Sequence, residues 1–60
     1  MNIEKANYCI EDINYKIKFY NDELKNEFVG YHRQAQLEDI ISGLLIAKSI
    51  IIKNFDLKSE

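Results

Sequence analysis

The sequence predicts an all-α fold in which two helices, over about residues 3–28 and 33–57, form an antiparallel hairpin that dimerises into a four-helix bundle. Three observations predict it. Apolar residues recur at steps of three and four in both halves of the chain, the 60 residues include no proline, and a glycine near the middle separates the halves. A chain this short holds one domain, which we assign to residues 1–60.

The first helix is predicted from seven apolar residues at alternating steps of three and four, a spacing that aligns side chains on one stripe of a helix. The stripe consists of Ile3, Ala6, Ile10, Ile13, Ile17, Tyr20 and Leu24. A strand is the alternative over residues 13–20, where apolar and polar residues also alternate. The helix accounts for a longer segment, and no turn sequence offers such a strand a hairpin partner.

The break between the helices is predicted at Val29–His32, because Gly30 can adopt the left-handed conformation that ends many helices. So short a connection leaves the two helices antiparallel, with their apolar stripes facing each other.

The second helix carries a wider apolar face than the first. Its stripe of Leu37, Ile40, Leu44, Ala47 and Ile51 is broadened by Ile41, Leu45, Ile52 and Phe55. Acidic residues lie near its expected start and basic residues towards its end, which suits the helix dipole. These residues are Glu38 and Asp39, then Lys48, Lys53 and Lys58. Lys48 falls within the apolar face, so we expect it to reach water or to pair with Glu11 or Asp12.

Apolar residues also occur on the sides that a two-helix hairpin leaves uncovered. At about 100° per residue, the first helix carries an aromatic stripe opposite its heptad stripe, and the second carries isoleucines on its outer side. We expect these residues to bind a partner: Tyr8, Tyr15, Phe19, Ile46 and Ile50. A glycine within a helix costs about 1 kcal/mol relative to alanine, so we expect close helix packing in the dimer at Gly43 and Ala47.

Composition excludes several classes of protein. The formal charge of −2 gives no bulk attraction to nucleic acid or to an anionic membrane. A lone Cys9 cannot form an intrachain disulfide, and the start of the chain lacks the features of an export signal, so we expect a cytoplasmic protein. The longest apolar tract, Ile40–Ile52, contains Lys48 and is shorter than the roughly 20 residues of a membrane span.

No group of residues indicates catalysis, a metal or a cofactor. His32 and Cys9 lack the partners that a metal site or a catalytic triad needs. The segment Leu37–Ile41 resembles part of the signature of the small sporulation aspartyl-phosphate phosphatases, which are helical hairpins too. Gln34, Ala35 and Gln36 replace the residues most specific to that signature. We therefore assign no catalytic residue and expect a non-enzymatic protein.

The leading hypothesis is a small protein-interaction module, a regulator, inhibitor or adaptor that works as a homo-oligomer and binds another protein. The alternative is a nucleic-acid-binding regulator that uses Asn14, Lys16 and Lys18. In plan the predicted hairpin resembles the plasmid copy-control RNA modulators of the Rop type, which dimerise into four-helix bundles. With the strand of residues 13–20, the alternative becomes a ribbon-helix-helix dimer on DNA.

Overall fold

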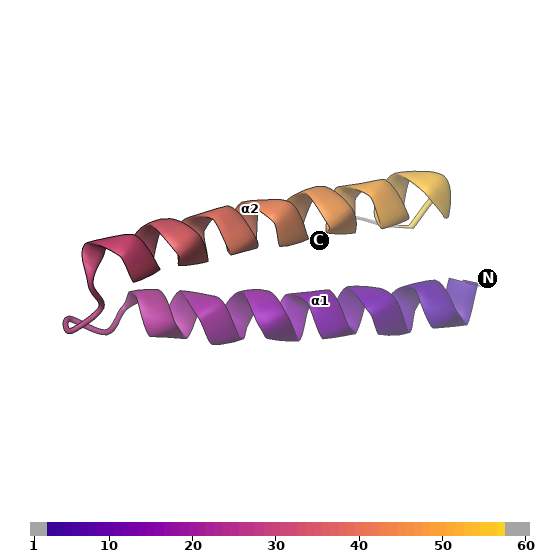
Figure 1. Cartoon of the computed structure of the whole chain (residues 1–60). Coiled ribbons are helices and arrows are strands. Elements are labelled where there is room, and N and C mark those ends of the chain that lie inside the picture. The colour runs from indigo at the N-terminus through magenta and orange to yellow at the C-terminus, as the bar shows by residue number, and fades with distance from the viewer. Residues whose placement is uncertain (1–2, 58–60) are drawn as a thin grey trace.

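The computed structural model describes residues 3–57, which form two helices packed side by side in opposite directions (Figure 1). Helix α1 spans Ile3–Leu24 and helix α2 spans Tyr31–Asn54. The predicted all-helical hairpin is confirmed for these residues, and they include no strand, so the strand over residues 13–20 and the ribbon-helix-helix built on it are wrong. The hairpin is an elongated rod of 41 × 18 × 14 Å.

Helix α1 ends at Leu24, four residues before the predicted boundary, because Asn26 redirects the backbone. The last turn closes with the Asn26 N–H donating to the Glu23 carbonyl at 3.0 Å. The Asn26 side-chain oxygen then accepts a hydrogen bond from the Phe28 N–H at 2.9 Å. The Asn26 backbone carbonyl accepts another from the Val29 N–H at 3.2 Å. When an asparagine side chain bonds to the backbone N–H two residues ahead, it replaces the hydrogen bond that would continue the helix.

Gly30 begins helix α2 and does not end helix α1, so the predicted left-handed conformation is wrong. Its φ of −76° and ψ of 166° are extended, and its carbonyl accepts the first helical bond from the Gln34 N–H at 2.9 Å. The connection is therefore residues 25–30, and α2 starts two residues earlier than predicted. Of the charges expected to suit the dipole of α2, Lys53 lies in its last turn. Glu38 and Asp39 lie beyond its first turn, which contains no acidic residue. Lys58 lies outside the described residues.

Helix α2 ends at Asn54, three residues before the predicted end, in a left-handed turn at Asp56. Asp56 has a φ of 53°, and the Leu57 N–H donates back to the Ile52 carbonyl at 3.0 Å. This six-to-one bond is typical of the Schellman motif, in which glycine usually occupies the left-handed position.

Asp56→Gly is expected to stabilise the protein by about 1 kcal/mol, because glycine adopts a positive φ without the steric cost that other residues meet there. The substitution also removes a negative charge from a helix C-terminus, where the dipole disfavours it. Chemical denaturation monitored by circular dichroism measures the change. Asp56→Ala, which removes the charge and keeps the side-chain penalty, separates the two contributions; an equal gain from both variants would contradict the backbone explanation.

The core of the hairpin is small. Among the described residues only Ala6 and Leu37 are fully buried. The other members of the α1 stripe from Ile10 to Leu24 are half-buried, whereas Ile3, predicted to belong to the same apolar face, is 60% exposed. On α2 the half-buried apolar residues are Ile41, Leu44, Ala47, Ile51, Ile52 and Phe55, the last just beyond its end. Two helices alone therefore leave much of their apolar surface in contact with water.

Candidate interaction surfaces

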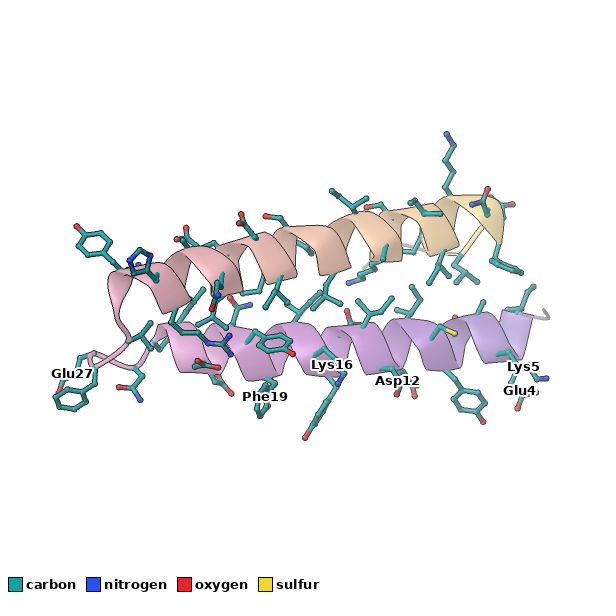
Figure 2. All side chains as sticks on the ribbon, viewed as in Figure 1. Glu4, Lys5, Asp12, Lys16, Phe19 and Glu27 are labelled. Carbon is teal, nitrogen blue, oxygen red and sulfur yellow. The ribbon has the colours of Figure 1, made fainter. Side chains whose placement is uncertain are left out.

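The outer face of α1, defined here by Tyr8, Tyr15 and Phe19, is aromatic and exposed. Tyr15 is 70% and Phe19 57% exposed, and Figure 2 shows Phe19 pointing away from α2. An open hollow of about 270 Å³ lies between the side chains of Tyr15, Lys18, Phe19 and Asp22. The Phe19 ring meets the half-buried Tyr20 ring edge-on, with centroids 5.4 Å apart and planes at 84°, so the hairpin itself supports its position.

Acidic residues surround this aromatic face. At about 100° per residue, the helix places four carboxylates beside the aromatic stripe and three lysines, Lys5, Lys16 and Lys18, at its edges. Glu4 and Asp12 point to the same side as Phe19 (Figure 2). The hydroxyl of Tyr8 donates a long hydrogen bond of 3.4 Å to Glu4 Oε1. The four acids are Glu4, Glu11, Asp12 and Asp22, all exposed.

The outer face of α2, defined here by Asp39, Gly43, Ile46, Ile50 and Lys53, lies on the opposite side of the hairpin. Ile46 is 62% and Ile50 55% exposed. A Cβ atom added at Gly43 would meet no atom within 4 Å, so no part of the described hairpin packs closely there. Ala47 is half-buried, whereas Gly43 is exposed. The five predicted partner-binding residues thus form two separate surfaces.

The residues predicted for the nucleic-acid alternative lie in the middle of α1. Asn14, Lys16 and Lys18 are all exposed, but they do not share one face of the helix. Lys18 borders the aromatic hollow together with Asp22, which opposes the attraction of the lysine for a phosphate.

Sequence reasoning missed the two most exposed aromatic side chains. Phe28 in the connection is 87% exposed, and Tyr31 at the start of α2 is 91% exposed. The available signal was an aromatic residue just before the predicted break and another within it, because loops lie on the surface. Together they add exposed aromatic surface to the turn end of the hairpin.

An ion pair across the connection was also missed. Arg33 on α2 donates two hydrogen bonds to the Glu23 carboxylate on α1, from Nε to Oε2 at 2.7 Å and from Nη2 to Oε1 at 3.0 Å. The hydrogen bond from Arg33, aided by its charge, lowers the pKa of Glu23 below its ordinary value. This bidentate contact fixes the end of α1 against the first turn of α2. In contrast, Lys48 is half-buried and forms no ion pair with Glu11 or Asp12 in the described part of the chain.

Glu23→Gln is expected to remove a small contribution to stability that depends on pH. A carboxylate with a lowered pKa in the folded state stabilises the fold above its ordinary pKa of 4.5, and this contribution disappears as the pH falls through the lower, folded value. Thermal melts at pH 7 and pH 3 measure the difference between the variant and the parent chain. We expect a modest difference at pH 7 and a smaller one at pH 3, with molar salt also reducing it because the pair is exposed. A difference at pH 3 as large as that at pH 7 would contradict this role of the ion pair.

Residues 3–57 contain no cluster of three or more His, Cys, Asp or Glu side chains that could hold a metal ion. Cys9 is a half-buried free thiol and His32 is exposed. Neither helix, over the residues described, is long and apolar enough to cross a membrane. No family model, curated protein or solved structure matches this chain.

Proposed function

We propose that this chain is a small, non-enzymatic protein-interaction module that works as a homo-oligomer of helical hairpins. One observation carries the proposal: only Ala6 and Leu37 are fully buried among the described residues, while large apolar side chains are exposed on both outer faces. The outer face of α2 pairs copies of the chain, and the outer face of α1 binds another protein. Because the two faces lie on opposite sides, both can be occupied at once.

The exposed area of the hairpin supports association. The whole chain exposes 5034 Å², whereas a folded monomer of 7.1 kDa is expected to expose about 4100 Å². The excess is comparable to the roughly 800 Å² that each partner contributes to a standard protein interface. Helix α2 also carries apolar side chains on two sides, because Ile46 and Ile50 are exposed on the side opposite the one that packs on α1.

The outer face of α1 has the features of a binding site for a second protein. Large aromatic side chains dominate many interfaces because they bury much area and lose little conformational freedom. Tyr15 and Phe19 border a hollow that can receive an apolar side chain, and the surrounding carboxylates favour a partner whose rim is basic.

The alternative function, binding to nucleic acid, is favoured by one observation, the position of Lys18 beside the two aromatic rings. The four carboxylates of the same face and the net charge of −2 oppose it. Such binding would weaken steeply with salt, whereas an aromatic protein interface would weaken little.

Affinity capture from the source organism tests the proposal. The chain is expected to retain a protein partner that Tyr15→Glu/Phe19→Glu loses by at least about tenfold, because two charges replace the aromatic anchors. The matched control is Asn7→Glu/Asn21→Glu, which adds the same charge to exposed positions on a different side of α1 and is expected to retain the partner. Equal recovery with both double variants, or recovery of RNA alone, would refute the proposal.

A further inference from the structure

We propose that two copies of this chain pair along the outer face of α2, antiparallel, with the twofold axis passing beside Ile46. This inference rests on the proposed function, since it names the surface and the register through which copies of the module associate. Three features of the face carry it: the spacing of its charges, the position of its glycine, and the contrast with the outer face of α1.

The charges of the face are placed symmetrically about Ile46. Asp39 and Lys53 each lie seven residues from Ile46, or about two helical turns, so the three positions fall on one line along α2. All three side chains are exposed, and neither charge has an ion-pair partner within residues 3–57. In an antiparallel pair centred on Ile46, Asp39 of each copy faces Lys53 of the other. The twofold axis produces this opposite-charge contact twice.

The same register explains the glycine. Ile50 and Gly43 lie on the same side of the line formed by Asp39, Ile46 and Lys53. In the antiparallel pair, the Ile50 side chain of one copy therefore meets Gly43 of the other. The space above Gly43 is open in the single hairpin, so it can receive that side chain. On the other flank Ser42 faces Ser49, and both are small and exposed. Large side chains thus meet small ones along one edge, and hydroxyls meet along the other.

The outer face of α1 is less suited to pairing with itself. Its four carboxylates outnumber the three lysines at its edges, Lys5, Lys16 and Lys18, so a symmetric pair brings an excess of negative charge together, which is unfavourable. In the α2-paired dimer this aromatic face points outwards on both copies and stays available for a different protein.

Complementary charge reversal tests the register. Asp39→Lys places two lysines opposite each other, and Lys53→Glu does the same with two carboxylates, so each variant alone is expected to raise the dimer dissociation constant about tenfold. Mixed together, the two variants restore opposite charges at both contacts, and native mass spectrometry is expected to show mostly the mixed dimer. Glu38→Lys, which reverses an exposed charge outside the line, is the matched control and is expected to leave the dimer unchanged.

Sedimentation equilibrium on the full chain separates the possible failures, with circular dichroism to verify folding. If the parent chain dimerises and neither charge reversal alters its dissociation constant, the α2 pairing is wrong while the proposed function stands. If each variant weakens the dimer but their mixture shows no preference for the mixed dimer, the Ile46-centred register is wrong. A parent chain that stays monomeric at about 100 µM contradicts both the pairing and the self-association in the proposed function.

Discussion

Leu37→Ala is expected to leave most of the chain unfolded at room temperature. Leu37 is the largest fully buried side chain among the described residues, and only Ala6 shares its complete burial. Truncating a buried leucine to alanine costs about 2–5 kcal/mol. At about 0.05–0.15 kcal/mol per residue, the whole stability of so small a fold is of the same size. Helical circular dichroism and guanidinium denaturation measure the loss.

Leu45→Ala is the matched control, because it makes the same chemical change at a position that is 48% exposed in the hairpin. We expect its cost to be below about 1 kcal/mol, since little contact is lost and alanine is the better helix former. Equal destabilisation by the two variants would contradict a core centred on Leu37. It would show instead that association buries Leu45 as completely as the hairpin buries Leu37.

Periodicity predicted the helices well because one physical requirement, burial of a continuous stripe, governs many residues at once. The stripe from Ala6 to Leu24 lies against α2 as its spacing indicated. The ends of the helices depend instead on single residues. Asn26 ends α1 through a side-chain hydrogen bond, and Asp56 adopts a left-handed conformation that sequence statistics assign to glycine. Periodicity carries no information about either.

The surface was predictable in part. Residues on the side of a helix away from its only neighbour must be exposed, and Tyr15, Phe19 and Ile46 are exposed for that reason. Their role in binding stays a prediction. The ion pair of Glu23 with Arg33 was not predictable, because it depends on how the six-residue connection aligns the two helices. The role of Gly30 was not predictable either, because a glycine can end one helix or begin the next, and the neighbouring residues decide which of the two it does.

Ile46→Glu/Ile50→Glu is expected to abolish self-association and to make the stability of the chain independent of its concentration. When folding is coupled to dimerisation, each tenfold dilution lowers the stability by about 1.4 kcal/mol per dimer. The parent chain should therefore melt at lower temperature on dilution. Two carboxylates on the outer face of α2 cannot be buried without a large desolvation cost, so the variant should melt low at every concentration.

Tyr15→Glu/Phe19→Glu is the control that makes this result specific, because it adds the same two charges to the opposite side of the hairpin. It should melt with the concentration dependence of the parent chain. A loss of that dependence in both double variants would show that association uses both outer faces, as in a bundle packed around all four helices. Loss in the α2 variant alone would show that the aromatic face stays uncovered when copies pair, which is the condition for binding a different protein there.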